Sequence, residues 1–187
     1  MEKEYKPVSF SKTTITELMV PTYANFGGKV HGGTILSLMD KAAYVCSTKH
    51  AGAYCVTVSV DGVDFLRPVE VGNLVSLHAS VNYVGRSSLI IGIKAVAEDI
   101  RERTESHTNT SYFSMVAVDA NMKSVQVPGL VLENSEDVRR FMKSKFRKEF
   151  RLKKKEELNE MIAKLESATD LNYLDKENCI VASTLKK

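Results

Sequence analysis

The segment spanning residues 25–40 begins as a glycine-rich loop and continues into a helix that is apolar almost all round. Unpaired backbone N–H groups at such a helix start can hold an anion or a carbonyl oxygen. A helix that is apolar on more than one side has to be covered on several sides, as when a sheet curls around it. Asp40 on that helix is costly unless it is paired, solvated or used in chemistry. The segment therefore predicts a buried central helix and a candidate reaction centre.

The pattern along the chain predicts an α+β fold. Residues 8–19 are expected to form a first strand that ends near Pro21, and the central helix is expected over residues 32–49, with Gly52 ending it. Period-two alternation then predicts consecutive antiparallel strands. These cover residues 56 to about 67, 74–84, 89–100 and 110–118, with a polar loop over 102–109 and a hairpin-like turn over 119–123. One long helix followed by such strands is typical of the α+β class.

Composition predicts one domain of ordinary size and an appendage. The chain has 187 residues, of which 43% are hydrophobic and 26% are charged. After about residue 130 the sequence becomes rich in Lys, Arg, Glu and Leu, which predicts one or two helices over residues 133–164. We therefore expect a folded domain over residues 8–130 and a basic, mainly helical extension over 131–187.

Charge and cysteine content favour a cytoplasmic protein. The net charge of +3 does not by itself require a nucleic-acid or membrane partner. We expect no secretory signal and no membrane span, because no apolar run of the required length occurs. Cys46, Cys55 and Cys179 are odd in number and lack metal-type spacing, so a zinc site or disulfide framework is not expected and a reducing compartment fits.

Each candidate site residue also has a purely structural interpretation. Asp40 could be a reactive carboxylate, or it could lie at the margin of a polar, solvent-facing stripe on its helix. Asn25 and the glycines after it could form only a tight turn. His31 could be a general base, or it could cap the helix or pack against it. Spacing alone leaves these alternatives open.

Two basic segments could contact anions. The turn at residues 85–88 (sequence GRSS) and Arg67 offer cations and hydroxyls that could hold phosphate groups, or they are simply exposed. Residues 139–155 are strongly basic and interleaved with phenylalanines. Such a run could contact nucleic acid or a membrane surface, or it could be the solvated face of a packed helix.

The motif Asn25-x-x-Gly28-x-x-His31-Gly32-Gly33, followed by Met39-Asp40, resembles the signature of hotdog-fold acyl-CoA thioesterases. It is most similar to the cytosolic acyl-CoA hydrolase type. The resemblance covers roughly residues 10–130, and further segments agree with it in the same order along the chain. They are VTVSVD at 56–61, FLRPV at 65–69, GN at 72–73, GRSS at 85–88, FSMVAVD at 113–119 and VP at 127–128.

The resemblance implies a sheet wrapped around the central helix, homodimers whose sheets join edge to edge, and often trimers of those dimers. It implies hydrolysis of fatty acyl-CoA to free acid and CoA, without a metal and without a cofactor beyond the CoA of the substrate. Asp40 would act as general base or nucleophile, Asn25 would place water or substrate, and the amide near Gly33 would polarise the carbonyl. The implied CoA-binding set is His31, Gly32, Arg67, Gly85, Arg86, Ser87 and Ser88.

Helix geometry adds an independent expectation. Gly33 and Asp40 are seven positions apart in the sequence, so on one helix they are separated by about 10 Å along the axis. One chain therefore cannot easily bring both groups to the same carbonyl. We expect a two-fold dimer with two composite sites, in which Asn25 and Gly33 of one chain work with Asp40 of the other.

Two other functions are compatible with a hotdog domain. The chain could be an acyl-CoA-binding regulator whose basic tail contacts nucleic acid, although no convincing helix-turn-helix is evident. It could also be a hotdog dehydratase or hydratase. Enzymes of that kind generally use a catalytic histidine with an acidic partner, whereas His31 here lies inside the thioesterase motif.

Overall fold

The computed structural model describes residues 4–166, 174 and 177–180. The chain divides into two compact units, Met1–Lys145 and Phe146–Lys187. The first unit contains every described strand, and the described part of the second is mainly helical. The predicted division between residues 130 and 131 stays a prediction about domain organisation. The predicted extension lies outside the described residues at 167–173, 175–176 and 181–187.

The first unit contains a five-stranded antiparallel sheet with the order β2-β4-β5-β6-β3, and β1 pairs with β7 in parallel. This arrangement confirms the predicted α+β class. The elements, in chain order, are β1 (Tyr5–Pro7), α1 (Val8–Ser11), β2 (Thr13–Leu18), a 3-10 turn (Pro21–Tyr23), α2 (Gly32–Ala51), β3 (Tyr54–Asp61), β4 (Leu74–Val84), β5 (Ser88–Asp99), β6 (Thr104–Val118), β7 (Gly129–Val131) and α3 (Ser135–Glu166).

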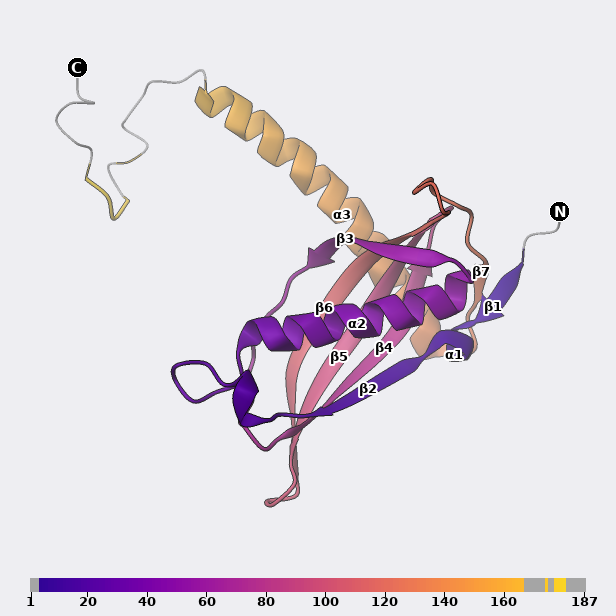
Figure 1. Cartoon of the computed structure of the whole chain (residues 1–187). Helices are drawn as coiled ribbons and strands as arrows, with labels where there is room; N and C mark the ends of the chain where they lie inside the picture. The colour runs from indigo at the N-terminus through magenta and orange to yellow at the C-terminus, as the bar shows by residue number, and fades with distance from the viewer. Residues whose placement is uncertain (1–3, 167–173, 175–176, 181–187) are drawn as a thin grey trace. The chain divides into compact units, whose positions relative to one another are not determined.

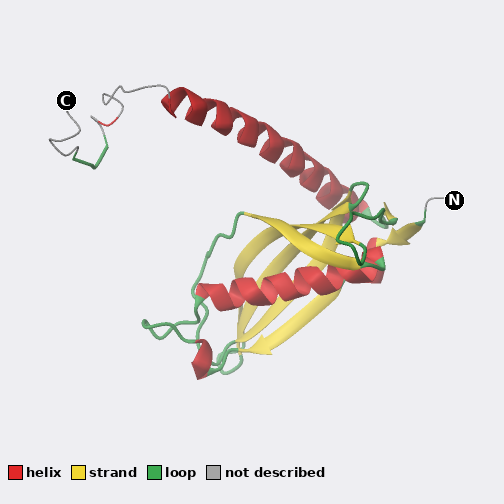
Figure 2. Cartoon of the chain, turned by 45° about the horizontal axis from the view of Figure 1, so that its top comes forward, coloured by secondary structure: helices red, strands yellow, loops and turns green. Residues whose placement is uncertain are grey.

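Helix α2 lies along one face of the curved sheet, as Figures 1 and 2 show. The core forms between them, because Ile35, Met39 and Cys46 of α2 are completely buried together with inward-facing residues of the strands, such as Leu77 and Phe113. The prediction of a buried central helix is confirmed. The helix keeps one exposed strip, however, and Asp40 lies on it.

Both ends of α2 follow from local chemistry. At the start, the side chain of His31 accepts a hydrogen bond from the backbone of the first turn. At the end, Gly52 adopts a left-handed conformation with φ 66°, and its N–H donates to the Thr48 carbonyl at 2.9 Å. Glycine adopts this conformation without steric cost. The predicted helix end is confirmed, and the helix continues two residues past Lys49.

The expected first strand over residues 8–19 is wrong in its first half. Val8–Ser11 form the short helix α1, which starts after Pro7, and only Thr13–Leu18 form a strand. The helical turn buries Val8 and Ser11, a spacing of three residues that alternation along a strand would place on opposite faces. Mixed β-branched and polar residues did not distinguish these two conformations.

Two further strand boundaries differ from the sequence prediction. Strand β3 ends at Asp61, and Gly62 follows with φ 56°, so residues 62–68 form a loop rather than a continuation of the strand. Residues 104–109 belong to β6, where the polar segment was expected to be a loop. They pair with β5 from Asp99↔Thr104 onward, because backbone hydrogen bonds can extend a hairpin past its core-facing residues.

Over residues 135–166, the extension forms the single helix α3, where one or two helices were predicted over 133–164. It begins after Asn134, whose Oδ1 accepts a hydrogen bond from the Asp137 N–H at 3.0 Å. Within the first unit, the Phe141 ring packs on the Tyr83 ring of β4 at a centroid distance of 5.1 Å.

Buried His50 predicts a pH-dependent stability. Its Nε2 lies 3.1 Å from the Pro128 carbonyl, and burial holds the pKa of His50 below its usual value of 6.5. The unfolded chain therefore binds a proton at His50 more readily than the folded chain does. The contribution of neutral His50 to the free energy of unfolding is thus fully present above about pH 6.5 and is lost as pH falls through the lower folded pKa. We expect the urea midpoint to fall between pH 7.5 and pH 5.5. His50→Gln should flatten that dependence, and an unchanged pH slope in this variant would contradict the assignment.

Candidate active site

The Asp40 carboxylate is held by a threonine from the neighbouring strand. The Thr57 hydroxyl of β3 donates to Asp40 Oδ1 at 2.7 Å. The same hydroxyl lies 3.3 Å from Met115 Sδ, but its single hydrogen favours the carboxylate oxygen, which is a stronger acceptor than a thioether sulfur. This bond fixes the orientation of the carboxylate and leaves its other oxygen available.

Sequence reasoning missed Thr57, although a signal was present. Asp40 lies twelve residues before Gly52, which is about 18 Å of helix, and Thr57 lies five residues after it, which is about 17 Å of strand. Because β3 returns alongside α2, the two residues come to the same level. Multiplying each residue count by the rise per residue of a helix or of a strand would have placed Asp40 and Thr57 side by side.

The surface around Asp40 is open. Tyr44 of α2 and Tyr54 of β3 pack edge to face beside it, with ring centroids 6.0 Å apart, and both are exposed. Val58 of β3 is 61% exposed. Among the described strands, β3 pairs only with β6, so its other edge carries no strand. An exposed apolar surface beside a free strand edge is typical of an interface.

Asn25 organises the loop before α2. Its Oδ1 accepts hydrogen bonds from the Gly27 N–H at 2.8 Å and from the Lys29 N–H at 3.2 Å. Gly28, with φ 75°, allows the tight turn between them. Because two N–H donors point at Oδ1, the side-chain orientation is fixed and Nδ2 is the donor left for a ligand. Both interpretations of Asn25, as turn former and as ligand donor, fit this geometry.

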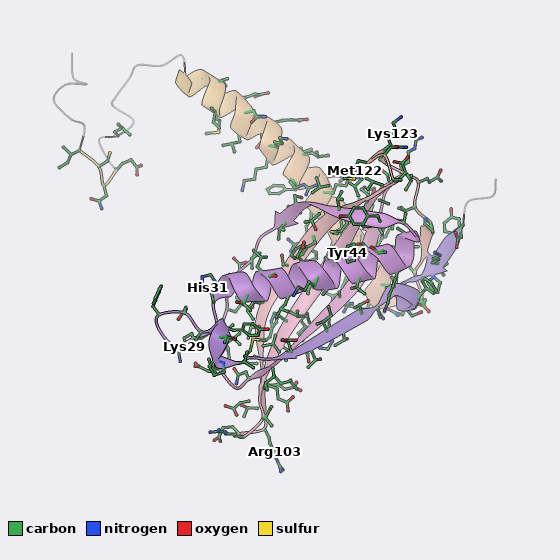
Figure 3. All side chains as sticks on the ribbon, in the orientation of Figure 1. Lys29, His31, Tyr44, Arg103, Met122 and Lys123 are labelled. Carbon is green, nitrogen blue, oxygen red and sulfur yellow. The ribbon has the colours of Figure 1, made fainter. Side chains whose placement is uncertain are left out.

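His31 caps α2 and occupies the amide of Gly33. The Gly33 backbone N–H donates to His31 Nδ1 at 2.9 Å. The backbone N–H of His31 donates to the Tyr23 carbonyl at 2.8 Å. Figure 3 labels His31 at the start of α2. A substrate carbonyl oxygen could therefore accept a hydrogen bond from the Gly33 N–H only if the imidazole ring of His31 moved away. The capping interpretation of His31 describes this geometry, with Nδ1 as an acceptor.

A hollow of about 580 Å³ opens beside this helix start. Three predicted site residues, Asn25, His31 and Gly32, line it. The Phe65 ring lies against Gly32, where an added Cβ would meet the ring at 2.9 Å. Arg67 is exposed two residues further along the same loop. These groups gather at the N-terminal end of α2.

The turn at residues 85–88 lies at the opposite end of α2. The Ser87 carbonyl accepts from the Ala117 N–H at 2.9 Å, and Ala117 pairs with Cys55, close to where the chain leaves the helix. The 20 residues of α2 correspond to about 30 Å. One chain therefore brings Asn25, His31, Gly32, Gly33 and Arg67 together at one end. Asp40 lies along the helix, and the other end holds Gly85, Arg86, Ser87 and Ser88.

A second cavity, of about 570 Å³, lies between the outer face of the sheet and the start of α3. Its lining includes Lys12, Lys94, Arg139 and Arg140 but none of the predicted site residues, so it is separate from the site at α2. Within the described residues, no group of three or more His, Cys, Asp or Glu side chains is arranged to hold a metal. Among them, too, no helix combines the length and the apolar character needed to cross a membrane.

Comparisons with known proteins identify relatives of this chain. The thioesterase superfamily model matches residues 27–104. The chain is 47% identical over 141 residues to protein VdlD of Helicobacter pylori, covering 75% of this chain and 80% of that protein. It is 33% identical over 128 residues to the uncharacterized acyl-CoA thioester hydrolase YkhA of Bacillus subtilis, covering 68% of this chain and 74% of that one.

Solved structures agree with these relatives. An acyl-CoA hydrolase from Staphylococcus aureus, in complex with butyryl-CoA, CoA and CoA disulfide, is 30% identical with a TM-score of 0.77, covering 87% of this chain and 99% of that one. A hexameric acyl-CoA thioesterase is 32% identical with a TM-score of 0.78, covering 81% and 97%. Variants of the S. aureus hydrolase with an asparagine, an aspartate or a threonine replaced by alanine also match. The chain therefore belongs to the thioesterase superfamily and is a hotdog-fold acyl-CoA thioesterase.

Proposed function

We propose that this enzyme hydrolyses fatty acyl-CoA to free fatty acid and CoA, with Asp40 as general base or nucleophile. The observation that carries the proposal is the contact of 2.7 Å between Thr57 Oγ1 and Asp40 Oδ1. It holds a carboxylate in one orientation on an exposed strip of an otherwise buried helix. A regulator that only binds acyl-CoA would not need a carboxylate held in a fixed orientation by Thr57.

The S. aureus hydrolase supports the choice of residues. The asparagine, aspartate and threonine replaced by alanine in that enzyme have the same spacing in sequence as Asn25, Asp40 and Thr57. In this chain the three residues come from the loop before α2, from α2 and from β3. We infer that they form one reaction centre.

Each site draws on two chains in this proposal. Along α2, about 10 Å separates Gly33 from Asp40, whereas a carbonyl donor and a base both need to lie within about 3 Å of the reacting atoms. A two-fold dimer joined at the free edge of β3 would cover the exposed Val58 and bring Asn25 of one chain to Asp40 of the other. The hexameric relative supports assembly of three such dimers.

The reaction uses water and groups of the two chains. Asp40 takes a proton from the attacking water, or attacks the carbonyl carbon itself, while Asn25 Nδ2 orients the water or substrate. The thioester carbonyl displaces the His31 ring and accepts the Gly33 N–H, which stabilises the developing oxyanion. The carbon–sulfur bond then breaks, and the CoA thiolate leaves and takes up the proton that Asp40 removed from water, or one from solvent if Asp40 itself attacked. On the second route water then hydrolyses the mixed anhydride at Asp40, which releases the fatty acid and restores the carboxylate. The proposal needs no metal and no cofactor beyond the CoA of the substrate.

In the proposed dimer, cationic and hydroxyl groups near both ends of α2 bind the CoA nucleotide. Arg67 lies near the helix start, and Arg86, Ser87 and Ser88 lie near the helix end, so in an antiparallel dimer the two groups would come from different chains. Arginine and hydroxyl groups suit phosphate oxygens. We place the reaction in the cytoplasm, which the free thiols of Cys46 and Cys55 support.

Replacing Asp40 by Asn tests the proposed function. The amide has the size of the carboxylate but cannot accept the proton or attack the thioester, so the rate of thiol release from a long-chain acyl-CoA should fall by about 100-fold or more. The oligomer, measured by light scattering, should stay unchanged. Near-normal hydrolysis by Asp40→Asn would exclude Asp40 from the chemistry.

Replacing Thr57 by Val tests the contact itself. Valine keeps the shape but removes the donor, so Asp40 loses its fixed orientation and kcat should fall by about tenfold or more, with a smaller change in KM. Thr57→Ser keeps the hydroxyl and should retain most of the activity. Equal activity of the two variants would show that the hydroxyl does not position Asp40.

A further inference from the structure

The described helical part of the second unit, residues 146–166 of α3, presents an exposed apolar face. Phe150 is 69% exposed and Met161 is 61% exposed. At about 100° per residue, five exposed apolar side chains fall within an arc of about 160°. They are Phe146, Phe150, Leu158, Met161 and Ile162. A helix of this length gains most of its stability from packing such a face.

Five charged side chains share this arc with the apolar ones, namely Arg147, Arg151, Lys154, Glu157 and Lys164, and two of them flank Phe150 and Met161. Around the helix axis, Glu157, Phe150, Met161 and Lys154 follow one another at steps of about 20°. They form a strip in which two apolar residues lie between an acid and a base. A free charge beside exposed apolar side chains gains little, whereas a partner that presents the complementary charge would satisfy both.

The charges are also divided along the helix. Residues 147–155 carry six cations and one acid, and residues 156–160 carry three acids and no cation. A second copy in parallel register would set the basic run against itself. A second copy in antiparallel register sets each basic run against an acidic run, in the way that charged positions decide orientation in coiled coils.

We propose that residues 146–166 pair antiparallel with the same segment of a second copy of this chain, centred between Lys155 and Glu156. Phe150 and Met161 are equally distant from this centre, and so are Lys154 and Glu157. In the pair, Phe150 therefore lies opposite Met161 of the partner subunit, and Lys154 lies opposite Glu157 of the partner subunit. The sequence repeats this complementarity on both sides of the two-fold axis.

An anionic membrane surface fits the face less well. Interfacial helices carry cations on the polar face and only apolar groups at the centre of the buried face. Here Glu157 lies next to Phe150 on the strip, so docking onto a bilayer would press a carboxylate against anionic headgroups. Pairing with a second copy gives Glu157 the ammonium group of Lys154 instead.

Disulfide trapping of the full chain tests the pairing and its direction. In a Cys179→Ser background, which removes the exposed native thiol, Phe150→Cys with Met161→Cys should form a covalent dimer under mild oxidation. Phe150→Cys alone should give at least about tenfold less covalent dimer, because the two copies of residue 150 would be about 16 Å apart along the helix axis. Equal crosslinking by the single variant would indicate a parallel pair, and no crosslinking by either would overturn the proposal.

Charge reversal gives a second readout. Adding Lys154→Glu to the double-cysteine chain should lower the crosslinked fraction by about fivefold or more, since each pair then holds two acid–acid contacts. Adding Glu157→Lys as well should restore it. Thiol release from acyl-CoA should be unchanged in all these variants. Crosslinking that is insensitive to charge, or that is lost on adding vesicles of anionic phospholipid with which the protein sediments, would contradict the proposal.

Discussion

Helix α2 is 20 residues long and packs on a curved sheet. It fixes the distance between the Gly33 amide at its start and the Asp40 carboxylate further along it. Packing of Ile35, Met39 and Cys46 into the core prevents the helix from bending to shorten that distance. Gly33 and Asp40 therefore stay about 10 Å apart along the axis. Every part of the proposed chemistry follows from this separation, because a thioester needs both groups within contact distance.

The same constraint explains features of the surface that a monomer would not need. Asp40, Tyr44 and Tyr54 are exposed beside a strand edge that no described strand covers. In a proposed two-fold dimer these residues lie at the interface, and the loop of Asn25 from one chain approaches Asp40 of the other. Thr57 then has a clear role, since it holds the carboxylate in place before a substrate arrives.

Sequence reasoning predicted those parts of the fold that depend on local chemistry. Gly52 ends α2 as predicted, since its left-handed conformation is a local requirement, and alternation predicted β4 at Leu74–Val84. It failed where pairing across the sheet decides the structure. Residues 104–109 extend β6 by pairing with β5, although their polar side chains indicated a loop. The contact of Thr57 with Asp40 joins a strand to a helix, so no motif at a single position of the sequence contains it.

Complementation between two inactive variants tests the shared site most directly. Asp40→Ala and Asn25→Ala chains, mixed in equal amounts and refolded together, should recover about a quarter of the wild-type rate of thiol release. About half of the dimers would be hybrids, and each hybrid would contain one intact site and one doubly altered site. The loop disturbed by Asn25→Ala belongs only to the altered site. If each site instead lay within one chain, the mixture would be no more active than the two variants refolded separately, and that result would rule out a site shared between chains.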